Sequence, residues 1–243
     1  MTIFSYIFIS VILVSLLSFI GVFFLALKKE ILNRFLGLLV SFACGSLLGG
    51  AFFHLLPESV GQLGESAFVW VMVSFLLFFI LEKFLYWRHC HKEHCEVHTF
   101  TYLNLIGDGL HNFIDGAIIA ASFLVNFSLG ISTTLAVIFH EIPQEIGDFS
   151  ILIYGGWKRR KALIFNFISA LTAIIGALAV YFFSKQISDL VPILLSFAAG
   201  GFIYIVGVDL IPELHKRREI SKSIIQFFSL TAGLILMWLL KIF

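Results

Sequence analysis

The stretch TYLNLIGDGLHNFIDGAIIAASFL, residues 101–124, decides which fold this chain can adopt. A helix of this length spans the roughly 30 Å hydrocarbon core of a bilayer. It nevertheless carries polar side chains at spacings of four, three, one and three residues, namely Asn104, Asp108, His111, Asn112 and Asp115. At about 100° per residue these side chains share one sector of a helix. Because a charge in hydrocarbon costs at least about 2.5–3.5 kcal/mol, this stripe should face the protein interior.

A second polar stripe is predicted in residues 129–154, LGISTTLAVIFHEIPQEIGDFSILIY. It consists of His140, Glu141, Gln144, Glu145 and Asp148. Two acidic, histidine-bearing stripes at similar depth are sheltered from lipid only if they face each other. We therefore expect these two helices to pack together.

The mixture of imidazole, carboxylate and carboxamide groups indicates a site for a divalent transition metal. Such a mixture suits zinc, ferrous iron or manganese better than the all-oxygen shells of calcium and magnesium. Without a cation, several buried acids would repel one another or take up protons. The predicted metal ligands are His111, Asn112, Asp115, His140, Glu141, Gln144 and Glu145. Asp108 and Asp148 are expected either to line the ion path or to orient those ligands.

One proline and three glycines are expected to shape this site. Pro143 removes a backbone hydrogen bond in mid-helix, which frees the carbonyl of Phe139 and predicts a kink. Gly107, Gly109 and Gly116 should allow the two polar helices to approach each other closely.

The composition of the whole chain agrees with a membrane protein. Of 243 residues, 60% are apolar and 13% are charged, and the mean hydropathy is +1.02. This leaves too little polar surface for a water-soluble globule. We predict an all-α polytopic membrane protein of eight transmembrane helices, forming a single transporter domain over residues 1–243. The spans are predicted at approximately Ile3–Leu27, Phe35–Leu56, Ala67–Leu85, Thr101–Leu124, Leu129–Tyr154, Leu163–Phe183, Leu190–Leu210 and Ile224–Phe243.

The basic residues indicate the orientation, since Lys and Arg collect in cytoplasmic loops. With eight spans, 14 of the 16 lysines and arginines lie on one side, and only Lys185 and Lys241 lie on the other. We expect an integral protein of the cytoplasmic membrane with both termini outside. The first apolar stretch is interpreted as a retained helix because Lys28 and Lys29 follow it, whereas a signal peptide has its charges in front.

Two segments of the chain repeat each other without a gap. Residues 41–58 read SFACGSLLGGAFFHLLPE, and residues 196–213 read SFAAGGFIYIVGVDLIPE. In the predicted topology they cross the membrane in opposite directions, which indicates an inverted repeat of spans one to three onto spans six to eight. Spans four and five then lie at its centre. The repeat pairs His54 with Asp209, which are expected as contacts at the outer entrance and the inner exit. The alternative is convergence of two small-residue helices.

The loop between the third and fourth spans, WRHCHKEHCEVHTF, gathers metal-binding residue types. Between residues 88 and 100 it contains His89, Cys90, His91, His94, Cys95 and His98. The spacing matches no closed structural zinc finger. Transient metal binding and an inert polar loop are both open interpretations.

Several of these segments resemble the ZIP (Zrt/Irt-like) family of metal transporters, in particular its histidine- and glutamate-rich subgroup. HNFIDG at 111–116 and HEIPQEIGDF at 140–149 are similar to the family's signature helices. NLIGDGLHNFIDG, FFHLLPES and GGFIYIVGVDLIPEL extend the likeness over essentially the whole chain. The resemblance implies eight spans, external termini, a two-metal site between the fourth and fifth helices, and movement of metal into the cytosol.

Residue by residue, the resemblance implies ligation by His111, Asn112 and Asp115 together with His140 and Gln144. The position of Gln144 is usually a histidine in that subgroup. A carboxamide is a weaker and harder ligand than imidazole, so this departure leaves room for manganese or iron.

The predicted function is transport of divalent transition metal ions toward the cytosol, with Zn²⁺ as the first substrate and iron, manganese or cadmium as others. The expected partners are the metal ion and the lipid bilayer, without nucleic acid, and a homodimer is left open. The chain has no nucleotide-binding loop, and no catalytic residue is expected.

Two alternative functions fit some of the same residues. An intramembrane zinc hydrolase is suggested by His140 and Glu141, which begin like an HExxH helix, but Gln144 replaces the second histidine of that motif. The other alternative is a proton or monovalent-cation carrier, in which the histidines would be relays.

Overall fold

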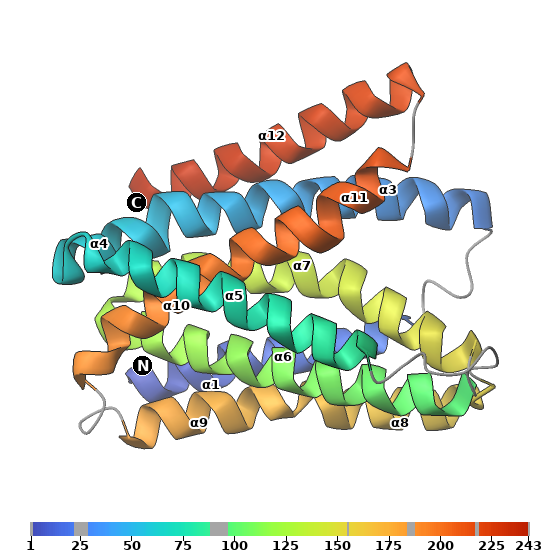
Figure 1. Cartoon of the computed structure of the whole chain (residues 1–243), viewed down its shortest axis with the longest axis horizontal. Coiled ribbons are helices and arrows are strands. Elements are labelled where there is room, and N and C mark those ends of the chain that lie inside the picture. The colour runs from blue at the N-terminus through green and yellow to red at the C-terminus, as the bar shows by residue number, and fades with distance from the viewer. Residues whose placement is uncertain are drawn as a thin grey trace.

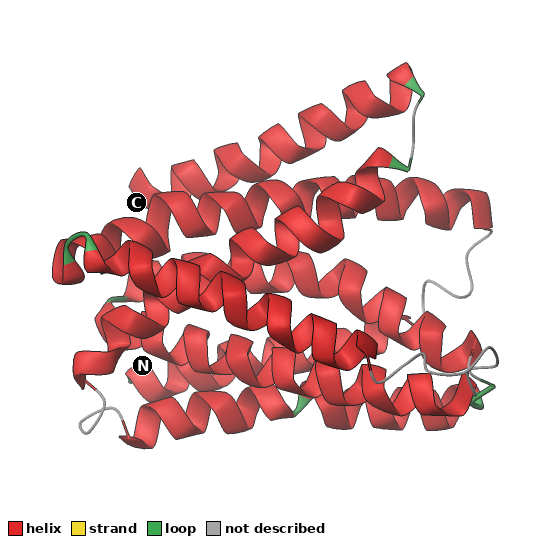
Figure 2. Ribbon diagram, viewed as in Figure 1, coloured by secondary structure: helices red, strands yellow, loops and turns green. Residues whose placement is uncertain are grey.

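The computed structural model describes residues 2–21, 29–87, 97–154, 156–183, 188–216 and 219–242. Within these ranges every regular element is helical and no strand occurs (Figure 2), which confirms the predicted all-α class. The α-helices are α1 (Ile3–Leu16), α3 (Lys29–Gly49), α4 (Leu56–Leu63), α5 (Ser66–Trp87), α6 (Val97–Val125), α7 (Phe127–Tyr154), α8 (Arg159–Ala170), α9 (Thr172–Phe183), α10 (Val191–Ile205), α11 (Ile211–His215) and α12 (Ile220–Ile242). Short 3-10 helices form η1 (Leu17–Phe19) and η3 (Ser188–Leu190), and π-helical turns form η2 (Gly50–Leu55) and η4 (Val206–Leu210).

Several of these helices are able to cross a membrane. In the described ranges, five stretches are long and apolar enough, namely Leu36–Leu63, Ser66–Lys83, Arg159–Phe183, Val191–His215 and Ile220–Lys241. α6 and α7 contain 29 and 28 residues, but their polar stripes lower their hydropathy. The apolar helix at Ile3–Phe19 is shorter, and residues 22–28 of the predicted first span lie outside the described part of the chain. The protein is an all-helical membrane protein, and the count of eight spans stays a prediction.

α6 and α7 lie in the middle of the bundle, as Figure 1 shows. α6 packs against α7 on one side and against α8 and α9 on another, while α7 also contacts α3. In the outer parts, α3 pairs with α12 and α10 pairs with α5. α7 remains one helix through Pro143. The two helices with polar stripes are therefore neighbours, as the sequence predicts.

Close helix contacts depend on glycines, as is common in membrane bundles. A Cβ atom on Gly116 of α6 would lie 1.8 Å from the carbonyl oxygen of Ala173 in α9, and one on Gly176 would lie 2.0 Å from that of Phe113. The nearest atom to a Cβ on Gly109 would be the Ser169 hydroxyl oxygen at 3.3 Å. The prediction that Gly109 and Gly116 bring α6 close to α7 is therefore wrong, because these glycines face α8 and α9.

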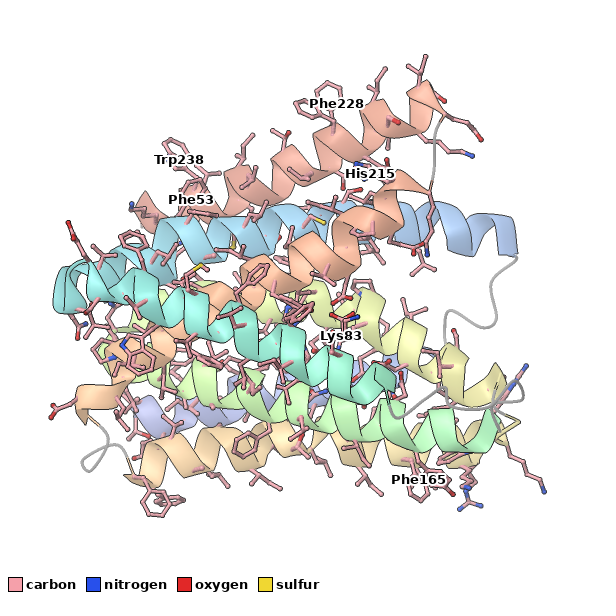
Figure 3. All side chains as sticks on the ribbon, in the orientation of Figure 1. Phe53, Lys83, Phe165, His215, Phe228 and Trp238 are labelled. Carbon is pink, nitrogen blue, oxygen red and sulfur yellow. The ribbon has the colours of Figure 1, made fainter. Side chains whose placement is uncertain are left out.

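The outer helices present large apolar side chains to their surroundings. Phe227, Phe228 and Trp238 of α12 are all more than half exposed, and Figure 3 shows Phe228 and Trp238 pointing outward from the bundle. Val69 and Ile80 of α5 are exposed to a similar degree. Apolar surface on this scale fits contact with lipid.

Candidate metal centre

The two central helices bring two imidazole rings into contact. His111 lies on α6 and His140 on α7, and their Nε2 atoms are 3.0 Å apart. The ring planes are nearly perpendicular, with an angle of 86° and centroids 5.3 Å apart. His111 and His140 are 29 positions apart in the chain, yet their ring nitrogens point into the same small volume.

Two carboxylates complete this arrangement. Asp115 Oδ2 lies 3.6 Å from His111 Nε2 and 3.1 Å from His140 Nε2. Glu141 Oε1 lies 3.4 Å and 3.5 Å from the same two nitrogens. Each residue contributes one ligand atom, and all four atoms lie within 4.8 Å of one another. We call His111, Asp115, His140 and Glu141 the four-donor cluster.

The spacing of the four-donor cluster matches a single small cation. In a tetrahedral zinc site with bonds of about 2.0–2.1 Å, neighbouring ligand atoms lie about 3.3–3.4 Å apart. The separation of the two Nε2 atoms and the four Nε2–carboxylate separations run from 3.0 to 3.6 Å, around that value. A set of two imidazoles and two carboxylates can therefore hold zinc or a similar divalent ion without large rearrangement.

Three carboxylate oxygens of this cluster have no hydrogen-bond donor among the described residues. Glu141 is fully buried, Asp115 is 2% exposed, and His140 is 1% exposed. Within the described part of the chain, Asp115 Oδ2 and both oxygens of Glu141 have no hydrogen-bond partner. Buried acceptors of this kind are costly unless a proton or a cation compensates them. A divalent cation would satisfy both carboxylates at once.

The tautomer of His140 suits metal binding. Its Nδ1 lies 3.1 Å from the carbonyl oxygen of Ala136, one helical turn earlier, so the N–H is placed on Nδ1. The lone pair is then on Nε2, which points into the cluster. This carbonyl contact is the usual way in which a protein orients a metal-bound histidine. Phe202 of α10 packs edge-on against the same ring and shields it.

The remaining predicted ligands lie next to the four-donor cluster, each with its own partner. Asn112 Nδ2 donates to Asp108 Oδ1 at 2.9 Å and to the Asp108 carbonyl at 3.2 Å, which leaves Asn112 Oδ1 and Asp108 Oδ2 without partners among the described residues. Gln144 lies beside Asp108. Glu145 Oε2 accepts a hydrogen bond from Asn166 of α8, and Asp148 Oδ1 accepts one from Asn104 at 2.9 Å.

Two predicted path residues lie in different π-helical turns, η2 and η4. His54, in η2, is 7% exposed, and its Nε2 lies 2.8 Å from the Met237 carbonyl oxygen of α12. Asp209, in η4, is exposed and lies near Glu82 of α5, which accepts a hydrogen bond from Tyr204. Neither belongs to the four-donor cluster.

A third predicted group, in the Cys/His loop, is not described by the structure. His89, Cys90, His91, His94 and Cys95 lie outside the described residues, as does the side chain of His98.

The sequence interpretation missed Asn166. This residue is fully buried in α8 and is the hydrogen-bond donor to Glu145. The signal was present in the sequence, because an asparagine stands in an apolar predicted span, Leu163–Phe183. Nothing in that span alone indicates which residue of another helix it would meet.

These observations identify a helical membrane protein in which two central helices bring together a buried group of side chains that could hold a divalent cation. The chain belongs to the ZIP family of zinc transporters, since the family described as "ZIP Zinc transporter" matches residues 2–98 and 88–241. This family consists of transporters, which disfavours the zinc hydrolase.

Individual relatives support the same assignment. Zinc transporter ZIP13 of Pongo abelii is 37% identical over 221 residues, covering 84% of this chain and 66% of that protein. The ZIP13 of Mus musculus is 34% identical over 251 residues, covering 84% and 70%. Zinc transporter ZIP10 of Danio rerio is 35% identical over 152 residues, covering 60% and 18%. The chain therefore spans about two thirds of the length of the ZIP13 proteins.

Proposed function

We propose that this chain carries zinc across a membrane toward the cytosol, through the four-donor cluster between α6 and α7. The observation that carries the proposal is the convergence of two imidazole nitrogens and two carboxylate oxygens, where Asp115 Oδ2 and both Glu141 oxygens have no hydrogen-bond donor among the described residues. Membership in a family of zinc transporters supports zinc as the first substrate. Iron, manganese and cadmium are further candidate substrates, because the same nitrogen and oxygen donors bind them.

We extend the proposal to eight spans arranged as an inverted repeat around α6 and α7. The π-helical turns η2 and η4 support it, since they end at residues that the repeat aligns, Leu55 and Leu210. In both copies a proline follows two residues later, in the first turn of the next α-helix. A proline has no N–H to donate, so a π-helical turn just before it is a natural accommodation.

The glycine contacts also fit the repeat. Gly45 of α3 and Gly200 of α10 are aligned, with Cys44 and Ala199 in front of them. A Cβ atom on Gly45 would lie 2.0 Å from a carbonyl oxygen of α12, and one on Gly200 would lie 2.5 Å from a carbonyl oxygen of α5. Each copy's second helix thus meets the third helix of the other copy.

The orientation in the membrane is proposed from charge. Both chain ends lie at the same end of the bundle in Figure 1, as an even number of spans requires. The excess of lysine and arginine at the opposite end favours a cytoplasmic location for that end. We propose that the termini are outside, in the cytoplasmic membrane, with His54 at the outer entrance and Asp209 at the inner exit. The predicted Cys/His segment at residues 88–100, whose last four residues belong to α6, would then lie at the cytosolic side and bind metal transiently.

Uptake into sealed vesicles tests the function. The purified chain in proteoliposomes should accumulate radioactive zinc above protein-free vesicles, with manganese, iron and cadmium competing. Absence of uptake by folded protein would refute transport. Metal-dependent hydrolysis in detergent would favour the hydrolase, and suppression of zinc binding by sodium at physiological concentration would favour a monovalent-cation carrier.

A further inference from the structure

Asn166 is a fully buried carboxamide that joins three helical segments. Its Nδ2 donates to Glu145 Oε2 of α7 and, at 3.3 Å, to the carbonyl oxygen of Ser18 in η1. Asn166 itself lies on α8 and is 0% exposed. A buried polar side chain in a membrane span is costly, so one with this connectivity requires an explanation.

Glu145 depends on this one side chain. It is fully buried, and within the described ranges its Oε2 accepts a hydrogen bond from Asn166 while its Oε1 has no partner. Glu145 lies one helical turn after Glu141, so both point to the same side of α7. Glu145 is nevertheless not a member of the four-donor cluster. A buried carboxylate that lost its amide donor would turn toward the nearest cation.

α8 is a fixed support for this contact. The Ser15 hydroxyl of α1 donates to the Ala170 carbonyl at 2.8 Å, which attaches the end of α8 to α1. The Ser169 hydroxyl donates to the Leu105 carbonyl of α6 at 3.0 Å. The last turn of α8, which follows Asn166, is therefore attached to both α1 and α6. The amide of Asn166 thus offers the Glu145 carboxylate a donor in a fixed position.

We propose that Asn166 is a positioning residue that holds Glu145 away from the four-donor cluster and thereby sets the metal selectivity of the site. The inference rests on the proposed transport function. With Glu145 held aside, the cation meets two imidazoles and two carboxylates. With Glu145 released, a third carboxylate joins, and a larger share of hard oxygen ligands favours manganese relative to zinc.

Zinc uptake in the presence of manganese tests this role. Asn166→Ala should lower the manganese concentration that halves zinc uptake by about tenfold, within the 10–100-fold range typical for residues that orient metal ligands. Glu145→Gln should keep the wild-type value of this manganese concentration, because its carboxamide oxygen still accepts a hydrogen bond from Asn166 and is a poor metal ligand. Ser15→Ala is the matched control, since it removes another buried hydrogen bond at α8 without touching Glu145.

An exchange of the two groups makes the test specific. Asn166→Asp alone places two carboxylates in contact and should shift selectivity as Asn166→Ala does. Asn166→Asp combined with Glu145→Gln restores an amide–carboxylate pair with reversed roles, and the manganese concentration that halves zinc uptake should return to within about threefold of wild type, because one hydrogen bond again joins the two side chains.

Several outcomes would overturn the inference. One is folded Asn166→Ala protein in which the manganese concentration that halves zinc uptake is unchanged. Another is an exchanged pair whose selectivity is as far from wild type as that of Asn166→Asp alone. Loss of uptake in Glu145→Gln would show that Glu145 is itself a ligand. If Asn166→Ala does not fold, the exchanged pair and Glu145→Gln decide. Failure of the wild-type protein to take up zinc would instead refute the proposed function.

Discussion

The acids of the two central helices fall into two regions that are stabilised differently. In the four-donor cluster, Asp115 and Glu141 face imidazole nitrogens and each other, and Asp115 Oδ2 and both Glu141 oxygens have no hydrogen-bond donor in the described structure. Farther along α7, Glu145 and Asp148 each accept one hydrogen bond from an asparagine of a neighbouring helix. The acids of the first region need a proton or a cation to compensate them, whereas those of the second are partly satisfied by the protein. The same residue type is therefore proposed to bind substrate in one place, and it joins helices in the other.

Removing a donor from the four-donor cluster should have the largest effect. We expect His111→Ala or Asp115→Ala to reduce zinc uptake by at least about 100-fold, because the loss of one partner leaves the other buried groups uncompensated. The folded protein should persist, as judged by a monodisperse profile in size-exclusion chromatography. Unchanged uptake in both folded variants would show that the ion passes elsewhere.

Acidification should weaken zinc binding at the cluster. Imidazole and carboxylate ligands must be deprotonated to bind metal, so protons compete with zinc and binding releases protons. Where one proton is displaced per zinc ion, apparent affinity should fall by about tenfold for each pH unit of acidification. Zinc titrations by calorimetry in buffers of different ionisation enthalpy measure the released protons directly. Affinity independent of pH would mean that the cluster does not ligate the ion.

Replacing the carboxamide beside the cluster should sharpen its selectivity. Gln144→His adds an imidazole where the family subgroup usually has one, and nitrogen donors favour zinc over manganese. We expect the preference for zinc over manganese in competition uptake to rise by several-fold, roughly 1 kcal/mol. Gln144→Asn serves as a control for local disturbance. An unaltered ranking of metals would show that Gln144 does not influence metal selectivity.

The smallest effect on zinc uptake is expected at Asp148, the acid of α7 that accepts a hydrogen bond from Asn104. Asn104→Ala removes the donor to Asp148 and should leave zinc uptake within about twofold of wild type. The cost should appear in stability instead, at about 0.6 kcal/mol, the average for hydrogen bonds between membrane helices. Thermal unfolding in detergent would measure this cost. A large loss of uptake would place Asp148 on the ion path and would erase the distinction between the two regions.

The polar stripes made the site predictable, because charges in a membrane helix have to face protein or an ion. Helical periodicity places Asp115 and His140 on the facing sides of their helices, their chemistry and the family resemblance predict them as ligands, and the structure brings them within 3.1 Å. The role of Gly116 was predicted wrongly, since a glycine indicates a close approach but not which helix approaches. Asn166 was missed for the same reason, because its partner Glu145 lies 21 residues away on another helix.

The all-helical membrane class and the two polar helices follow from composition and from the period of the helix, and the donor chemistry of the predicted site follows from the residue types on those helices. Only the tertiary structure decided which four donors converge, which acids are held by asparagines, and which helices the glycines face. These depend on the rotation and depth of each helix relative to its neighbours. That geometry is set by packing among segments distant in the chain, and local periodicity does not specify it.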